Sequence, residues 1–310
     1  MQQDATDTET VGDKANGPKR WRLFGVIGLL VALALIVAFV GVLIATKPNG
    51  QPEMNQAQRS LTVAQMLEQH PFLIAHRGGS ADWPEMSVTA YTQAVSLGVD
   101  ALEVSVARTR DGVFFGLHDR TLDRTSKISG QVDPTTLDWA DLKARYKNKL
   151  NSTDPAGEDY TPVSDVFGTF AASRVIFVDT KYIGDQQQRT DLINLMLSYA
   201  PADHWVLKGY YTDAALAHQA RQVGIQSWGY YYARDLTNLE STSSNWDMLG
   251  LELAATPAQW SQVTSKGKPT IAFFITGPAD LEQAVTKGAD GMMVSGVRAT
   301  LGVRRPVQSP

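Results

Sequence analysis

Short apolar runs alternate with stretches of helical periodicity over much of this chain, from about residue 71 to residue 303. The apolar runs predict strands over residues 72–75, 101–107, 113–117, 175–179, 205–208, 225–231, 248–253, 270–275 and 291–294. The periodic stretches predict helices over residues 87–97, 189–199, 213–223, 257–264 and 279–287, after a short entry helix over 61–69. Because strands and helices alternate, we expect a parallel sheet of the α/β class.

The number of predicted strands bears on the architecture. The third strand follows the second across only Arg110, Asp111 and Gly112, a link too short for a parallel crossover. Asp-Gly also favours a tight turn, so residues 113–117 are predicted to return antiparallel to the second strand. The remaining eight strands suffice for a closed TIM (β/α)8 barrel. An open doubly wound sheet is the alternative, which the lack of a G-x-G-x-x-G motif after the first strand weakens only slightly.

The N-terminal region has a different pattern. Residues 23–46 carry no charge and are long enough to span a bilayer as a helix, and Lys19, Arg20 and Arg22 stand directly before them. By the positive-inside rule we predict a single-pass anchor with a cytoplasmic N-terminus and an extracytoplasmic main domain. A cleaved signal peptide is the alternative, but the run is longer than a usual h-region and no A-x-A site follows it. The expected segments are a tail over 1–22, the transmembrane helix over 23–46, a linker over 47–70, the barrel domain over 71–303 and a tail over 304–310.

Composition narrows the function classes. The formal net charge of −4 argues against a nucleic-acid partner, which would require a basic face. The chain has no cysteine, which excludes disulfides, thiolate catalysis and cysteine metal sites. Neither the net charge nor the lack of cysteine identifies a reaction. The polar motifs of the sequence are more informative.

Those motifs stand at the predicted ends of strands. His76 and Arg77 end the first strand and His118 ends the hairpin arm, in a chain with only five histidines. Barrel active sites lie at the C-terminal ends of the strands, so we expect these side chains at one mouth. Further polar residues expected at the same mouth are Glu85, Glu103, Asp179 and Lys181.

These residue types are the ones that cleavage of a phosphodiester needs. Two histidines can act as general base and general acid near neutral pH. Arginine and lysine can neutralise phosphoryl oxygens, and carboxylates can hold Mg²⁺ or Ca²⁺. A neighbouring hydroxyl of the substrate can also attack first and form a cyclic phosphate that water then opens.

Several of these residues have structural alternatives. Glu103 lies inside an apolar strand, where an ion pair with Arg77 or Lys181 would offset its burial. Glu85 can instead cap the helix that begins near residue 87, and Asp119 is expected to orient His118.

Other features of the domain have less specific interpretations. Lys208 and Glu252 are additional candidates for buried charge. The aromatic residues around the fifth and sixth strands are expected to pack in the core or to line the alcohol side of a pocket. Residues 119–169 are long for a barrel loop and are predicted to influence substrate choice.

At its motifs the chain resembles a known family. The order His-Arg-Gly, Pro-Glu, Glu-x-Ser, Asp-Gly and His-Asp, between about residues 73 and 125, is similar to that of the glycerophosphodiester phosphodiesterase family. This family shares a superfamily with phosphatidylinositol-specific phospholipase C. Val-Asp-Thr-Lys at 178–181 and the closing GADGMMVS agree more weakly. The resemblance implies a TIM barrel that hydrolyses a glycerophosphodiester to glycerol 3-phosphate and an alcohol, usually with Mg²⁺ or Ca²⁺.

The resemblance also implies a role for each residue. His76 and His118 take the general acid and general base roles. Arg77 holds the phosphoryl oxygens, and Lys181 neutralises the charge that develops on phosphate. The metal carboxylates are Glu85, Glu103 and Asp179.

Three positions depart from the family pattern. Ser105 stands where the family has Asp, Asp179 where it has Glu, and Met86 where it has Asn. The lost charge at position 105 should weaken cation binding, which leaves metal dependence open. We therefore predict a membrane-anchored phosphodiesterase acting on phospholipid-derived or envelope glycerophosphodiesters. The alternatives are a metal-independent lyase that forms a cyclic phosphate and a non-catalytic domain that binds phosphodiesters.

Overall fold

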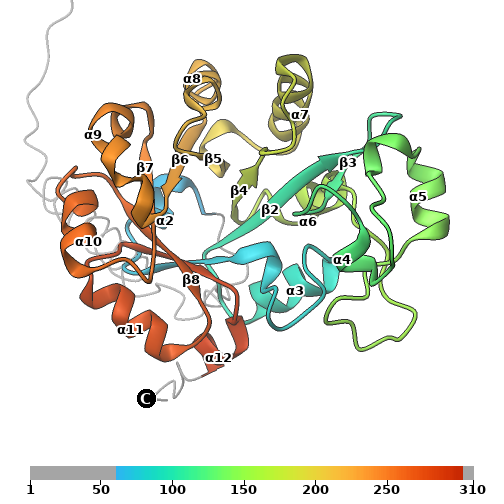
Figure 1. Cartoon of the computed structure of the whole chain (residues 1–310), viewed down its shortest axis with the longest axis horizontal. Coiled ribbons are helices and arrows are strands. Elements are labelled where there is room, and N and C mark those ends of the chain that lie inside the picture. The colour runs from blue at the N-terminus through green and yellow to red at the C-terminus, as the bar shows by residue number, and fades with distance from the viewer. Residues whose placement is uncertain (1–60, 303–310) are drawn as a thin grey trace, which may run out of the picture. The chain divides into compact units, whose positions relative to one another are not determined.

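A barrel of parallel strands forms the centre of the computed structural model, which describes residues 61–302 (Figure 1). β1 pairs in parallel with both β2 and β9, and this closes the barrel. The barrel strands are β1 (Phe72–Ala75), β2 (Ala101–Arg108), β4 (Val175–Asp179), β5 (Trp205–Tyr210), β6 (Gln226–Tyr231), β7 (Met248–Glu252), β8 (Thr270–Ile275) and β9 (Gly291–Val294). The predicted TIM barrel is confirmed, and the open-sheet alternative is wrong.

The remaining strand, β3 (Phe114–Gly116), is the predicted hairpin arm. It pairs antiparallel with β2, with Ala107 opposite Phe115. Gly112 has a φ of 96°, a conformation that the tight turn requires and that glycine adopts without steric cost. The hairpin carries the chain from the end of β2 toward His118.

Helices surround the barrel (Figure 1). The helices between or after barrel strands are α3 (Val88–Ser96), α6 (Val163–Phe170), α7 (Gln186–Tyr199), α8 (Ala214–Gln222), α9 (Leu239–Thr242), α10 (Pro257–Thr264), α11 (Pro278–Thr286) and α12 (Val297–Gly302). The five barrel helices expected from periodicity begin and end within three residues of the observed ones. The predicted entry helix is observed as α2 (Val63–Leu67).

Alternation along the strands separates two cores. Inward side chains such as Phe72, Phe177 and Trp228 pack inside the barrel, where Met66 of α2 joins them. The intervening residues, such as Leu102 of β2, pack against the helices. Successive side chains of a strand point to opposite faces of the sheet. A polar residue that stands two positions from an inward-facing residue on the same strand therefore also points into the barrel.

The long segment after the hairpin is not a plain loop. It contains α4 (Asp123–Ser126) and α5 (Trp139–Arg145) before α6. Phe115, Leu122, Leu142 and Tyr160 form a small core of its own. This segment packs over the end of β2 and thereby holds the chain beyond His118 in a defined position.

The predicted membrane anchor over residues 23–46 lies outside the described residues. Within residues 61–302, no helix is both long and apolar enough to cross a membrane.

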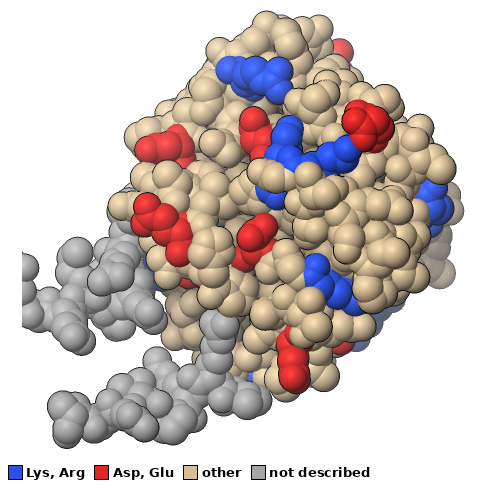
Figure 2. Space-filling model, turned by 90° about the vertical axis from the view of Figure 1, so that its left-hand side faces the viewer, with Lys and Arg blue, Asp and Glu red and all other residues tan. Residues whose placement is uncertain are grey.

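One face of the molecule appears in Figure 2 with its charges marked. Acidic and basic side chains are interspersed there among uncharged residues, so neither sign dominates that face.

Candidate active site

The polar side chains of the barrel stand on three adjacent strands near their C-terminal ends. Ser105 of β2 is the register partner of Asp179 of β4, which is the partner of Lys208 of β5. Phe177 and Val206, two positions earlier on their strands, pack in the barrel interior. Ser105, Asp179 and Lys208 therefore form one inward-facing layer at the barrel mouth.

The turn after β1 has an unusual backbone. Arg77 has a φ of 52°, and Gly78 follows with a φ of 80°. A Cβ atom on Gly78 would lie 2.8 Å from the Cβ of Ala90, so this turn requires glycine. The conformation aims the Arg77 N–H at Glu103, to which it donates at 2.8 Å. A left-handed non-glycine residue costs about 1–3 kcal/mol, and such strain is typical of functional turns.

His76 is buried at the mouth. A hydrogen bond of 2.8 Å joins its Nδ1 to Ser295 Oγ, and its ring stacks on Phe274 with centroids 4.2 Å apart. Its Nε2 is buried and has no partner among the described residues. Burial, followed by the charges of Arg77 and Lys208, lowers the pKa of His76 well below 6.5. The ring is therefore neutral at pH 7 and has one nitrogen available.

His118 has a more open and more acidic surrounding. Its Nδ1 lies 2.7 Å from Asp119 Oδ1, and its side chain is 29% exposed. Burial and the charge of Arg77 lower its pKa, while the hydrogen bond to Asp119 raises it. Asp119 also pairs with Arg124. Of the two histidines at the mouth, His118 is thus the one with a carboxylate partner. This partner is Asp119, which the sequence predicted to orient His118.

Glu85 is held by two arginines. Arg77 donates to its Oε2 at 3.1 Å, and Arg124 donates to its Oε1 at 2.6 Å. Met86, next to it, has a φ of 59°, so it keeps a left-handed conformation that asparagine adopts more readily. Glu85 therefore helps to hold the Arg77 side chain in place. It does not cap α3, whose N-terminus is capped by Ser87.

Glu103, Asp179 and Lys208 form a buried group that we call the Lys208 cluster. The Lys208 ammonium lies 2.8 Å from Glu103 Oε1 and 3.2 Å from Asp179 Oδ2. Burial alone would raise the pKa of Glu103, but the charges of Lys208 and Arg77 outweigh it and lower the pKa. Burial alone would lower the pKa of Lys208, and the two carboxylates raise it instead. Glu103 and Lys208 are therefore both charged.

Lys181 follows Asp179 at the end of β4. Its backbone N–H donates to Asp179 Oδ1 at 3.1 Å, and its ammonium lies 5.2 Å from the centroid of the Tyr182 ring. Burial, only partly offset by Asp179, lowers the pKa of Lys181 to about 8. Its charge lowers the pKa of both His76 and His118, which places it at the same mouth.

Aromatic rings line the opposite side of the mouth. The Tyr230 ring lies 5.9 Å from the Phe273 ring, and Tyr232 lies 5.6 Å from Phe273. The Lys208 ammonium is 5.6 Å from the Trp228 ring and 5.7 Å from the Tyr230 ring. Trp228, Tyr230 and Tyr232 belong to the aromatic group that the sequence assigned to the core or to a pocket wall.

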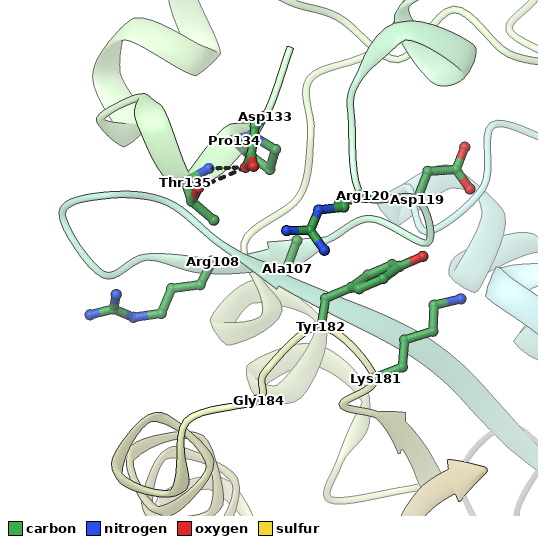
Figure 3. A pocket seen from close by; sticks show the side chains of 10 residues that line it. All are labelled: Ala107, Arg108, Asp119, Arg120, Asp133, Pro134, Thr135, Lys181, Tyr182 and Gly184. Carbon is green, nitrogen blue, oxygen red and sulfur yellow. Dashed lines mark hydrogen bonds between the residues drawn. The ribbon is translucent and has the colours of Figure 1, made fainter. Parts of the chain in front are cut away.

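A pocket of about 270 Å³ adjoins this mouth (Figure 3). Asp119 and Lys181 are shared between the pocket and the site. The side chains of Arg120 and Tyr182 extend over it in opposite directions, whereas Arg108 extends away. The pocket has room for a small substituent beyond the histidines.

The carboxylates do not gather into the predicted metal site. Glu85 binds two arginines, and Glu103 and Asp179 bind Lys208. Ser105 donates to Glu103 Oε1 at 3.2 Å and contributes no charge. Among residues 61–302, no group of three or more acidic or histidine side chains is arranged to hold a metal ion. These residues do not fit the ligand set that Mg²⁺ or Ca²⁺ prefers.

The structure thus brings most of the predicted site residues together. His76, Arg77, His118 and Lys181 interact electrostatically at one mouth, as expected. Lys208, which the sequence indicated as a candidate for buried charge, belongs to its centre. Three partners carry no local signal in the sequence and were not predicted: Arg124, Phe274 and Ser295.

Comparison with known proteins gives a consistent result. The model of the glycerophosphoryl diester phosphodiesterase family matches residues 76–264. Over 73 residues the chain is 48% identical to the probable glycerophosphodiester phosphodiesterase 1 of Mycobacterium tuberculosis, which covers 24% of this chain and 27% of that protein. Over 129 residues it is 40% identical to human glycerophosphodiester phosphodiesterase 1, covering 41% of this chain and 38% of that protein. The matched stretches are thus well under half of each relative.

Solved structures share the fold. A Silicibacter pomeroyi putative glycerophosphoryl diester phosphodiesterase has a TM-score of 0.63 at 16% identity, covering 79% of this chain and 98% of that one. An Oleispira antarctica phosphodiesterase in complex with the product sn-glycerol-3-phosphate has a TM-score of 0.62 at 18% identity, covering 74% and 94%.

Proposed function

Because the chain belongs to the glycerophosphoryl diester phosphodiesterase family, we propose that it hydrolyses a glycerophosphodiester to glycerol 3-phosphate and an alcohol. The observation that carries the proposal is the pair His76 and His118 beside Arg77 and Lys181 at one barrel mouth. The Oleispira phosphodiesterase, which has the same fold, binds sn-glycerol-3-phosphate, and this supports the product class.

His76 acts as the base that activates the nucleophile. If its Nδ1–H donates to Ser295, the unpartnered Nε2 carries the lone pair that accepts a proton. Its lowered pKa keeps it neutral at pH 7, and a bound phosphodiester anion would offset part of the surrounding positive charge. The nucleophile is water or the neighbouring glycerol hydroxyl, whose oxygen forms a bond to phosphorus as its proton passes to Nε2.

His118 acts as the acid. Its hydrogen bond to Asp119 stabilises the imidazolium, so it is the histidine more easily protonated in the complex. It gives a proton to the alcohol oxygen as the phosphorus–oxygen bond breaks. If the glycerol hydroxyl attacked first, water opens the cyclic phosphate with the two histidines in exchanged roles.

The cationic groups bind the phosphoryl oxygens. Arg77 Nε is buried without a partner among the described residues, so it is a donor available to the substrate. Lys181 adds a second positive charge at the same mouth. The alcohol would extend into the pocket beside Asp119 and Tyr182 (Figure 3).

A membrane location is the second part of the proposal. The uncharged segment 23–46 follows Lys19, Arg20 and Arg22, which favours an anchor with the barrel outside the cytoplasm. Retention in the membrane fraction after a carbonate wash, together with digestion of the barrel by protease added to intact cells, would support it. Release by the wash would contradict anchoring, and protection from the protease would contradict the orientation.

The activity is tested by turnover of glycerophosphocholine and glycerophosphoglycerol by the full chain in detergent. We expect glycerol 3-phosphate from at least one of them, lost in His118→Ala and kept in His218→Ala, whose histidine is exposed on α8. A cyclic phosphate as the only product would favour the lyase alternative. Binding of the substrates without turnover, unchanged in His76→Ala, would favour a binding domain.

A further inference from the structure

The centre of the site holds a lysine where a cation would be expected. We propose that Lys208 takes the place of the divalent cation in this chain, so that the reaction proceeds without a bound metal. The inference rests on the proposed function and concerns how the same site manages its charge.

The Lys208 ammonium occupies the position between two carboxylates. The Lys208 ammonium lies within hydrogen-bonding distance of Glu103 and Asp179, at 2.8 Å and 3.2 Å. These are two of the carboxylates that the family resemblance assigns to a metal. Lys208 is only 6% exposed, and its register neighbours hold it in the inward-facing layer. A divalent ion bound between these carboxylates would have to displace a buried, paired ammonium.

The net charge of the Lys208 cluster equals that of a metal site with three carboxylates. Three carboxylates around a divalent cation carry the same net charge as two carboxylates around one ammonium. Here Glu85 is paired with Arg77 and Arg124, and Ser105 stands where the family has Asp, which leaves Glu103 and Asp179 around the single positive charge of Lys208. The departure at position 105 and the lysine at position 208 therefore compensate each other electrostatically, and neither leaves a buried charge unmatched.

Two aromatic rings lie near the Lys208 ammonium. The Trp228 and Tyr230 rings stand 5.6 Å and 5.7 Å from Lys208 Nζ. Aromatic faces attract an organic cation such as ammonium. Mg²⁺ and Ca²⁺ instead take six or more oxygen ligands, which these faces do not provide.

The charge of Lys208 also acts on His76. The Lys208 charge contributes to the lowered pKa of His76, so its field extends to the proposed base. A positive charge at that place can stabilise a phosphoryl group that gains negative charge, as a metal would.

The test begins with the unmodified full chain in detergent. After EDTA treatment we measure Mg²⁺ and Ca²⁺ binding by calorimetry, the melting temperature with and without each cation, and turnover of glycerophosphocholine and glycerophosphoglycerol. We expect no saturable binding, an unchanged melting temperature and full turnover. Stoichiometric binding of either cation, or turnover lost in EDTA and restored by it, would overturn the proposal.

A double variant then asks whether the metal site can be recreated. Ser105→Asp/Lys208→Ala should bind Mg²⁺ or Ca²⁺, melt at a higher temperature with the cation, and become cation-dependent in turnover. Lys208→Met alone should lower turnover on the order of 100-fold. Lys287→Met is the matched control, because Lys287 donates to the backbone carbonyls of Leu253 and Ala255 and, among the described residues, pairs with no carboxylate of the Lys208 cluster. Full turnover in Lys208→Met would contradict a role for its charge.

The two proposals fail in different ways. Absence of turnover under every condition counts against the proposed function, while calorimetry and melting still decide whether a cation binds. Cation-dependent turnover refutes the Lys208 proposal and leaves the phosphodiesterase proposal intact.

Discussion

The two halves of the barrel mouth are built from different chemistry. The half formed by β1, β2, β4 and β5 consists of ion pairs, whereas the half formed by β6 and β8 consists of aromatic rings. The charged half contains His76, Arg77, Glu103, His118, Asp179, Lys181 and Lys208, and the aromatic half contains Trp228, Tyr230, Tyr232, Phe273 and Phe274.

The contrast between the two halves explains why the electrostatic field acts on only a few unpaired groups. On the charged side the carboxylates Glu85, Glu103 and Asp179 are each paired with a cation, so few groups remain free to meet a substrate. His76 Nε2 and Arg77 Nε are two buried atoms there that have no partner among the described residues. The aromatic side excludes water and lowers the local dielectric, which strengthens the fields that those free groups feel. Phe274 joins the two halves, because it stacks on His76.

The largest expected effect lies in the charged half. His118→Ala should lower kcat by about 10²–10⁴-fold, because it removes the proposed acid. His76→Ala should have an effect of the same order. Steady-state kinetics on the preferred substrate check both, with His218→Ala as the unaffected control. A loss of less than about tenfold in His118→Ala would show that the charged half does not carry the proton transfers.

The next effect is on stability. Glu103→Gln leaves Lys208 facing one carboxylate instead of two, and breaking a buried ion pair costs about 3–5 kcal/mol of unfolding free energy. Urea unfolding of the full chain measures the loss. Asp138→Asn is the matched control: Asp138 pairs with Arg110 at the exposed surface and should barely change stability. Equal losses in both variants would remove the distinction between the buried cluster and an ordinary surface pair.

A smaller effect is expected where the halves meet. Phe274→Ala uncovers His76, and since burial is the main cause of its lowered pKa, the pKa should rise toward 6.5. A base acts when neutral, so turnover should fall more steeply than in the wild type as pH decreases from about 8 to about 6. The pH profile of kcat/KM checks this. An unchanged acidic limb would mean that the ring does not control the proton affinity of His76.

The smallest effect is expected within the aromatic half. Tyr230→Phe keeps the ring and removes a hydroxyl that makes no hydrogen bond with a described residue. Turnover should stay within about threefold of wild type, as is usual when packing is preserved. A loss comparable to that of His118→Ala would show that the aromatic half takes part in the chemistry and would end the comparison.

By itself the sequence determined the local features of this protein. Alternation of apolar and polar residues located the strands, and Asp-Gly identified the hairpin that reduces nine strands to a barrel of eight. The His-Arg-Gly turn and the His118-Asp119 pair were recognisable for the same reason, because each depends on neighbours within a few residues.

Only the tertiary structure decided how distant charges are matched. Lys208 reaches Glu103 across 105 positions, and Ser295 reaches His76 across 219, because closure of the barrel sets β5 near β2 and β9 beside β1. The three predicted metal carboxylates show the consequence. Each has the residue type of a ligand, but their partners are cations from other strands and loops: Arg77, Arg124 and Lys208. Strand periodicity says which face a side chain occupies, whereas the register between strands decides which charge it meets.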